Sequence, residues 1–233
     1  MTEEAPPATL PRWALGAAAT GWVSGMVCGG VLLGLWVAAT GQDTRALGSL
    51  GVAQVGFWVG LLGAVVVTSR RGGTGSLVRD FGLRFRAVDL PIGVAVGAVA
   101  QFFVVPLIYF PFRSLIDKGD LERPARELVS RAHGPAFLAF AAVIAIGAPV
   151  MEELFYRGLL LRSLQRYLAD GPAVFISGLI FAASHFELLQ LPALALVGVA
   201  FAVLVVKTGR LGPAIWAHVM FNTITVVALG LKR

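Results

Sequence analysis

The chain has 233 residues, of which 57% are hydrophobic and only 14% are charged. A soluble globular chain carries about 45–50% apolar and about 25% charged residues, so a mean hydropathy of +0.81 indicates a membrane protein. The formal charge is +6, but the basic residues stand at the ends of apolar runs, where they suit loops facing lipid headgroups rather than nucleic acid. The single cysteine, Cys28, excludes an intramolecular disulfide and a cysteine-built zinc site.

The first thirteen residues, Met1 to Trp13, are expected to form a polar tail. This tail lacks the basic start of a secretory signal, and the apolar run after it is too long for a cleavable signal peptide. We therefore expect a retained membrane helix to follow. No later polar block exceeds about twenty residues, which is too short for a soluble domain. The sequence predicts one membrane domain over residues 14–233.

Long apolar runs predict an all-α, polytopic transmembrane helical bundle with about seven spans. The topology also leaves room for an eighth or re-entrant segment. The fifth and sixth runs are shorter than the roughly 20 residues of a full crossing, so we expect them inside the bundle, shielded by neighbouring helices. The expected spans are Ala14–Ala39, Leu47–Thr68, Leu90–Phe112, Pro135 to beyond Arg157, Pro172–Phe186, Leu191–Val206 and Gly212–Leu229.

Glycines recur at four-residue spacing in the early spans. In a membrane this spacing lets helix backbones approach closely, so it predicts helix packing and carries no chemistry. The glycines concerned are Gly21, Gly25, Gly29, Gly30, Gly34, Gly56, Gly60, Gly93 and Gly97.

Two polar connections separate the early spans, and the second, Arg113–Arg131, mixes charges of both signs. Pro124 is expected to begin a short surface helix there, with Leu128 and Val129 facing inward. The first connection, Ser69–Asp89, carries five arginines. With seven spans, the N-terminal side collects 11 basic residues, including Arg12, and the other side collects 8, including Lys232 and Arg233. The positive-inside rule then predicts a cytoplasmic N-terminus in the cell membrane.

The first of three costly polar groups in apolar spans is the stretch Glu152-Glu153-Leu154-Phe155-Tyr156-Arg157. On a helix the two carboxylates project about 100° apart, and Glu153 lies four residues before Arg157. The arginine can therefore hold one carboxylate while the other faces elsewhere, which suits one glutamate as general base and one as structural partner. The alternative is a helix end at the interface with a surface pair.

The second group lies in the fifth span, where one helical turn separates Phe181 from His185. A lone histidine is often a hydrogen-bonded core residue, but at membrane depth a functional role gains weight. The third is His218 and Asn222, which lie on one face of the seventh span. Both can donate hydrogen bonds to a developing oxyanion. An interhelical hydrogen bond is the structural alternative.

These three motifs, in this order on successive membrane helices, resemble the CPBP family. That family contains the CAAX-processing endopeptidases of the Rce1 type and the bacterial Abi and bacteriocin-processing proteins. The resemblance covers about residues 135–229, and all three motifs are intact. A weaker likeness to bacterial members lies in Phe81-Gly82-Leu83-Arg84.

The resemblance implies an intramembrane endopeptidase acting on a membrane-associated protein or peptide. Glu152 would activate water with the help of His185, and His218 and Asn222 would stabilise the oxyanion. Supporting roles would fall to Glu153, Arg157 and Phe181, and Arg157 could also meet a peptide carboxylate. A metal-free mechanism is favoured because an amide beside His218 suits oxyanion binding. Zinc held by Glu152, His185 and His218 is the alternative.

Two other classes of function remain open alternatives. Buried glutamates and histidines can form the proton relay of a transporter, although no internal repeat is visible in the sequence. A non-enzymatic scaffold or immunity factor would retain the motifs for packing. In each case the bilayer is the expected environment, no nucleic acid is expected as a partner, and the sequence predicts no oligomeric state.

Overall fold

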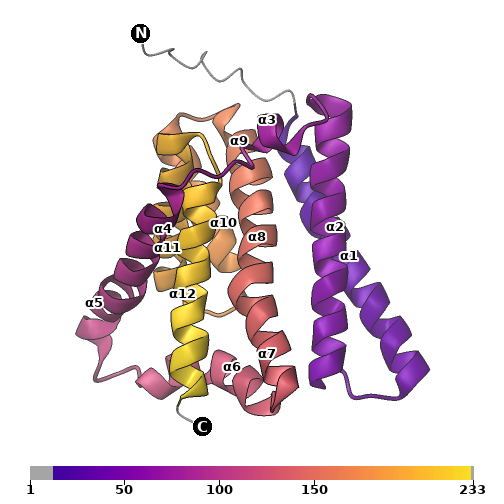
Figure 1. Ribbon diagram of the computed structural model, residues 1–233, viewed down its shortest axis with the longest axis vertical. Helices are drawn as coiled ribbons and strands as arrows, with labels where there is room; N and C mark the ends of the chain where they lie inside the picture. The colour runs from indigo at the N-terminus through magenta and orange to yellow at the C-terminus, as the bar shows by residue number, and fades with distance from the viewer. Residues whose placement is uncertain (1–12, 232–233) are drawn as a thin grey trace.

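The structure is a computed structural model that describes residues 13–231. Within these residues every regular element is helical, and the helices run along one common direction as a bundle (Figure 1). The expected tail up to residue 12 and the charges of Arg12, Lys232 and Arg233 lie outside the described residues. Trp13, the last residue of that expected tail, is buried, and its ring centroid lies 5.1 Å from that of Phe81.

Six helical stretches are long and apolar enough to cross a membrane, which confirms the prediction of a polytopic helical bundle. Four are single helices: α1 (Leu15–Thr40), α2 (Leu47–Gly72), α11 (Leu191–Thr208) and α12 (Gly212–Gly230). The third span, Asp89–Phe112, joins α4 (Asp89–Val99), η1 (Ala100–Val104), α5 (Val105–Tyr109) and η2 (Phe110–Phe112). The fourth, Pro135–Gln165, joins α7 (Pro135–Ala142), η3 (Val143–Gly147), α8 (Ala148–Glu153), η4 (Leu154–Leu160) and α9 (Leu161–Gln165).

The expected fifth span is α10 (Asp170–Ala183), whose 14 residues give a helix about 21 Å long. It is too short to cross a 30 Å hydrocarbon core in one straight pass. The expectation that neighbours shield α10 and α11 holds for one face of each helix. On the other face, Phe175 of α10 and Leu196 of α11 are about half exposed.

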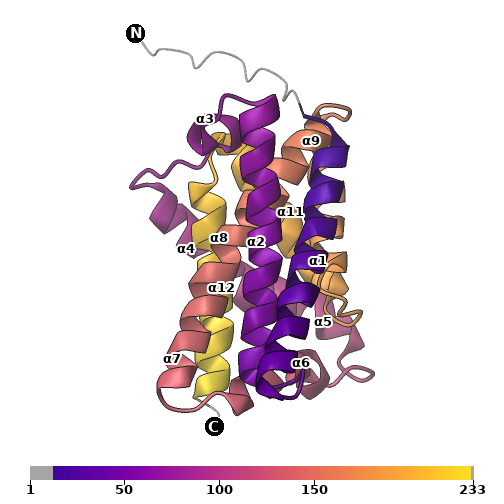
Figure 2. The same ribbon diagram turned by 90° about the vertical axis from the view of Figure 1, so that its right-hand side faces the viewer.

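Close glycine packing joins α1 and α2 into a hairpin. A methyl group on Gly60 would lie 2.5 Å from the backbone of Gly25, and one on Gly56 would lie 2.7 Å from the carbonyl oxygen of Cys28. The predicted packing role of these glycines is therefore confirmed. It is wrong for Gly30 and Gly34, where a methyl group would meet nothing within 4 Å. Figure 2 shows the hairpin in front of α8 and α12.

A second glycine face joins α4 to α12. Methyl groups on Gly93 and Gly97 would overlap Trp216 and the carbonyl oxygen of Ala217 respectively. The predicted packing role of this pair is also confirmed. Helix α4 thereby lies directly against the face of α12 that runs from Pro213 to Met220, on the helix that carries His218.

Two of the three π-helical turns in the composite spans lie beside prolines. The π turn η1 is followed by Pro106, and η3 is followed by Pro149. Since proline lacks an N–H, a helix containing it loses one backbone bond and readjusts its register locally. The third, η4, begins directly after Glu153. π turns in α-helices often occur at functional sites, and here two of them flank the Glu152–Glu153 pair.

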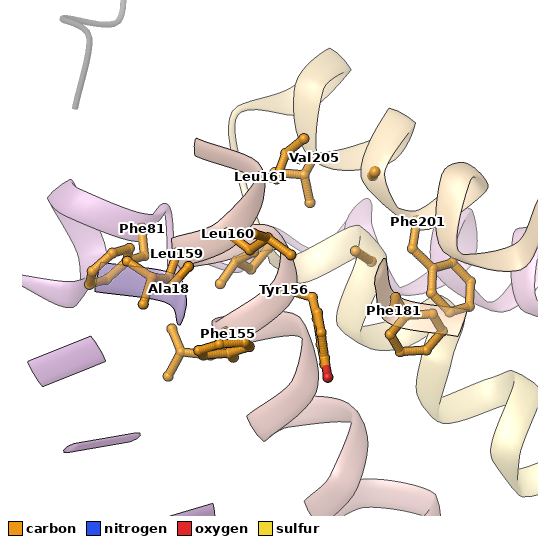
Figure 3. Packing of buried hydrophobic residues seen from close by; sticks show 14 of the residues in the cluster. Ala18, Phe81, Phe155, Tyr156, Leu159, Leu160, Leu161, Phe181, Phe201 and Val205 are labelled. Atoms are coloured by element: carbon orange, nitrogen blue, oxygen red, sulfur yellow. The ribbon is translucent and has the colours of Figure 1, made fainter. Parts of the chain in front are cut away.

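The core consists of aromatic and aliphatic side chains around η4. Figure 3 shows the ring of Tyr156 between that of Phe155 on one side and that of Phe181 on the other, with Phe201 next to Phe181. All four of these rings are buried. Such a dry aromatic wall lowers the local dielectric, which strengthens any charge interaction beside it.

The surface helix of the second polar connection is α6 (Lys118–Arg131), which begins six residues earlier than predicted. The prediction that Pro124 starts the helix was wrong, because the Asp117 side chain caps the N-terminus by accepting from the N–H of Gly119 at 2.6 Å. The predicted inward face is present, since Val129 is buried and Leu128 is partly buried.

At the opposite end of the bundle, a short helix, α3 (Leu77–Phe81), is held by Asp80 (Figure 1). The Asp80 carboxylate accepts hydrogen bonds from the Ser69 hydroxyl and from the Thr74 backbone N–H and hydroxyl. Burial alone would raise the pKa of the Asp80 carboxyl, but the bonds from Ser69 and Thr74 outweigh it and hold that pKa below its usual range. Asp80 thus closes the turn that leads out of α2.

Candidate functional site

Glu153 and Arg157 form the predicted pair, but in the interior of the protein. Arg157 Nη1 lies 2.8 Å from Glu153 Oε1, and both side chains are fully buried. Arg157 Nη2 also donates to the carbonyl oxygen of Gly198 at 3.0 Å. The guanidinium lies 4.3 Å from the ring centroid of Phe181 and 5.6 Å from that of Phe201. The alternative of an interfacial surface pair is therefore wrong.

His218 joins the two glutamates. Its Nδ1 lies 2.9 Å from Glu153 Oε1, and its Nε2 lies 3.8 Å from Glu152 Oε2. Because a carboxylate only accepts, the Nδ1–H donates to Glu153, which directs Nε2 toward Glu152. The imidazole is buried, with its centroid 5.6 Å from that of Phe181 and 5.2 Å from that of Phe201. Glu153 therefore fixes the ring orientation of His218.

Glu152 differs from Glu153 in exposure and in partners. Its side chain is 17% exposed, whereas that of Glu153 is fully buried. Within residues 13–231 its carboxylate accepts no hydrogen bond, and its Oε2 lies 3.8 Å from His218 Nε2. Helix geometry predicted that one carboxylate would be held and the other would face elsewhere, and this division is present. Glu152 is the partly exposed carboxylate of the pair.

His185 lies beyond the helix in which the sequence placed it. Helix α10 ends at Ala183, and Phe186 has a left-handed backbone with φ of 56°, which stops the helix. His185 Nδ1 donates to the carbonyl oxygen of Phe181 at 2.8 Å, so the ring folds back over the last turn. Its centroid lies 4.8 Å from that of Phe181. Placing His185 within the fifth span was therefore wrong, because its own side chain caps the helix end.

A hydroxyl pair ties His185 to the glutamate helix. The Tyr156 hydroxyl donates to Ser184 Oγ at 2.7 Å, and Ser184 Oγ donates to the same Phe181 carbonyl at 2.7 Å. That carbonyl thus accepts from both Ser184 and His185. Sequence reasoning missed Tyr156 and Ser184, although each is a hydroxyl within an otherwise apolar run beside a predicted site residue.

Asn222 makes an interhelical hydrogen bond, which is the structural alternative considered for it. Its Nδ2 donates to the carbonyl oxygen of Ile144 at 2.9 Å. In the π turn the N–H of Ala148 bonds to Val143, and the next donor, which would serve Ile144, falls on Pro149. Asn222 therefore satisfies a carbonyl that its own helix leaves unpaired. A primary amide has two N–H groups, so one remains for another acceptor.

The structure thus brings Glu152, Glu153, Arg157 and His218 into direct contact, and Phe181 contacts both histidine rings. Asn222 lies one turn beyond His218 and turns toward Ile144. In the part of the chain that the structure describes, no three His, Cys, Asp or Glu side chains are grouped to hold a metal ion. Glu152, His185 and His218 are therefore not grouped as a set of metal ligands in this arrangement.

Fold and site together define a multi-pass helical membrane protein with a buried Glu–Arg–His centre beside one partly exposed carboxylate. Residues 134–224 match the family model Rce1-like, described as type II CAAX prenyl endopeptidase Rce1-like. This match over residues 134–224 confirms the resemblance read from the motifs. The match supports a CAAX-type protease. No curated protein and no solved structure matches the chain.

Proposed function

We propose that the chain is an intramembrane endopeptidase that hydrolyses a peptide bond of a membrane-associated protein or peptide. The observation that carries this proposal is the bridging position of His218, with Nδ1 on Glu153 and Nε2 3.8 Å from Glu152. A general base needs one carboxylate that is free and close to water, and a second group that fixes its surroundings. The unequal glutamates meet both requirements.

In this mechanism Glu152 takes a proton from the attacking water and later returns one to the leaving amine. Glu153 is unsuited to that task because its Oε1 already accepts from both Arg157 and His218. Its role is to brace the imidazole. Arg157 is fully buried and bonded to Glu153 and Gly198, so it braces Glu153 and has no surface to offer a peptide carboxylate.

His218 and Asn222 would stabilise the tetrahedral oxyanion. With Nδ1–H engaged by Glu153, His218 donates through Nε2 only when the ring is doubly protonated. Asn222 would use the N–H that does not bond to Ile144. His185 would hold the water through Nε2, since its Nδ1 is engaged by Phe181.

Substitution of Glu152 by Gln tests this proposal directly. The purified variant in lipid nanodiscs is expected to lose at least a hundredfold in cleavage of a membrane-anchored peptide library, because the amide cannot take a proton. The matched control is Glu127→Gln on α6, where the carboxylate is 61% exposed and pairs only loosely with Arg131 at 4.0 Å. Full cleavage by Glu152→Gln would end the proposal.

The remaining alternatives give different outcomes in the same preparation. Loss of activity with chelator, restored by one equivalent of zinc, would establish the zinc-dependent version with Glu152, His185 and His218 as ligands. Ion flux in proteoliposomes without cleavage would favour a transporter. An unchanged cellular phenotype for Glu152→Gln and His185→Ala would favour a scaffold or immunity factor.

We also propose the cell membrane as the location and a cytoplasmic N-terminus. Both rest on the arginine-rich connection between α2 and α4. Arg157 is one of the 11 basic residues counted on the N-terminal side. It lies buried in the protein and contributes nothing to orientation. Fusion of a reporter that is active on one side of the membrane to Ser76 would test the orientation.

A further inference from the structure

Arg162 on α9 is a partly buried cation that makes no hydrogen bond to any residue the structure describes. Its Nε is buried and unpaired, and neither of its Nη atoms hydrogen-bonds any residue between 13 and 231. A guanidinium carries five N–H donors and a permanent charge. Leaving it in a partly dry environment without an acceptor is costly, so the position implies a ligand or a functional reason.

The neighbours of Arg162 increase that cost. Arg84 is an exposed residue two positions after Gly82, and it carries a charge of the same sign as Arg162. The Arg162 Nη2 atom lies 2.7 Å from the place where a side chain on Gly82 would begin, and Gly82 itself has a left-handed φ of 69°. Glycine adopts this left-handed turn readily, and because Gly82 has no side chain it also leaves room for the Arg162 guanidinium.

The nearest acid does not pair with Arg162. Asp80 attracts its charge, but both Asp80 oxygens accept hydrogen bonds from Ser69 or Thr74. Asp80 is thus bonded to Ser69 and Thr74, and within residues 13–231 no carboxylate hydrogen-bonds Arg162. An anion with several acceptor oxygens would satisfy both guanidinium groups.

The position of Arg84 is fixed by the backbone. The carbonyl oxygen of Gly82 accepts from the N–H of Leu211 at 2.8 Å, and that of Arg84 accepts from Gly212 at 3.2 Å. These bonds tie the stretch Phe81-Gly82-Leu83-Arg84 to the start of α12. The motif noted in the sequence thus has a structural role, which is to fix the backbone that carries Arg84 against the start of α12.

The pair lies at the end of the bundle where α3 and α9 lie, opposite α6 (Figure 1). Ten residues of helix separate Arg162 from Glu152, a rise of about 15 Å, so this place is distinct from the candidate active site. Helix α9 ends a membrane span, and the span end is the depth at which lipid phosphates lie. Further arginines of the Ser69–Asp89 connection stand at the same end.

We propose that Arg84 and Arg162 bind a phosphate group, supplied by the headgroup of an anionic phospholipid. Guanidinium groups bind phosphate oxygens in a bidentate manner, and basic pockets between membrane helices on the cytoplasmic side bind anionic headgroups. A phosphatidylcholine phosphate is already neutralised by its own choline. An anionic lipid such as phosphatidylglycerol lacks that internal counter-charge.

The test compares the unfolding temperature of the full chain in nanodiscs of phosphatidylglycerol and of phosphatidylcholine. Phosphatidylglycerol is expected to raise the Tm of the wild type by about 5 °C. The Tm of Arg162→Gln is expected to differ from that of the wild type in opposite directions in the two lipids. In phosphatidylcholine the variant is at least as stable, because an unpaired buried charge is gone, and in phosphatidylglycerol it is less stable. Arg84→Gln is expected to lose about half of the lipid-dependent rise.

The matched control is Arg70→Gln, an exposed arginine at the same end of the bundle. It is expected to keep the wild-type response to lipid. Equal losses in Arg162→Gln and Arg70→Gln would mean diffuse surface electrostatics and would overturn the proposal. Equal destabilisation of Arg162→Gln in both lipids would mean a purely structural role and would also overturn it.

Two further arms complete the test. Inorganic phosphate added to phosphatidylcholine nanodiscs at constant ionic strength distinguishes the sources of the anion. Inorganic phosphate could raise the Tm of the wild type but not that of Arg162→Gln, with phosphatidylglycerol raising neither. The ligand of the phosphate site would then be a soluble anion, and the lipid assignment would be overturned. If Arg162→Gln fails to fold, Arg162→Lys keeps the charge without the planar fork. The lysine variant is then expected to fold and to bind phosphatidylglycerol about tenfold more weakly, and wild-type affinity would overturn the bidentate site.

Discussion

The α1–α2 hairpin and the helices around η4 are held together by different interactions. In the hairpin, glycine backbones touch, and only 11% of the apolar 18-residue stretch of α1 is buried inside the protein. Around η4, aromatic rings enclose a buried ion pair, and 44% of the apolar 18-residue stretch of α12 is buried. Close packing without polar groups suits a lipid-facing support. Buried charges with fixed partners suit chemistry.

The comparison is tested most severely by Arg157→Met. Removing one partner leaves the Glu153 carboxylate buried beside a neutral side chain, so the free energy of unfolding is expected to fall by about 3–5 kcal/mol. Chemical unfolding in detergent measures this change. The control is Arg126→Met on α6, whose pair with Glu122 is half exposed and is expected to contribute about 0–1 kcal/mol. Similar losses in both variants would contradict a special buried centre.

The hairpin is tested by Gly60→Val. The added side chain would overlap the backbone of Gly25, so α1 must move away, at a cost of about 1–3 kcal/mol. The control is Gly63→Val on the same helix, where nothing lies within 4 Å. Because the site residues lie on other helices, cleavage per folded molecule is expected to stay within about twofold. A complete loss of cleavage would show that the two regions are not separable.

Asp80→Asn tests the turn between the two regions. Charge-assisted bonds from Ser69 and Thr74 are lost, so the free energy of unfolding is expected to fall by about 2 kcal/mol at neutral pH. The lowered pKa of Asp80 in the folded state fixes the sign of the pH dependence. The advantage of the wild type is present above the unfolded pKa of about 4 and is lost as the pH falls through the lower folded value. Asp43→Asn on an exposed loop is the control.

The smallest effect on stability is expected for Tyr156→Phe, which removes only the hydroxyl that donates to Ser184. The free energy of unfolding should fall by about 1 kcal/mol, whereas kcat should fall about tenfold because the His185 turn loses an anchor. KM is expected to stay unchanged. The pH profile of kcat should widen or shift, which loss of packing alone would not produce. Tyr167→Phe, at an exposed ring, is the control.

The helical type of the bundle followed from the sequence because long apolar runs have few other structures in a bilayer. The number of spans did not, since six helical stretches among the described residues, rather than seven, are long enough to cross. The Glu153–Arg157 pair followed as well, since four-residue spacing on a helix fixes it locally. The end of α10 did not follow, because it depends on a left-handed Phe186 and on two side chains that share one carbonyl. Nor did the His218 bridge, because it depends on how α12 packs against α8.

Pro149 and Asn222 show how a side chain far away in the sequence replaces a missing backbone hydrogen bond. The proline withholds one donor, and an amide 78 residues from the orphaned carbonyl supplies it. An alanine at position 149 would return that donor and release the Asn222 side chain. The orientation of a predicted oxyanion ligand is thus set by the absence of a single hydrogen atom on another helix.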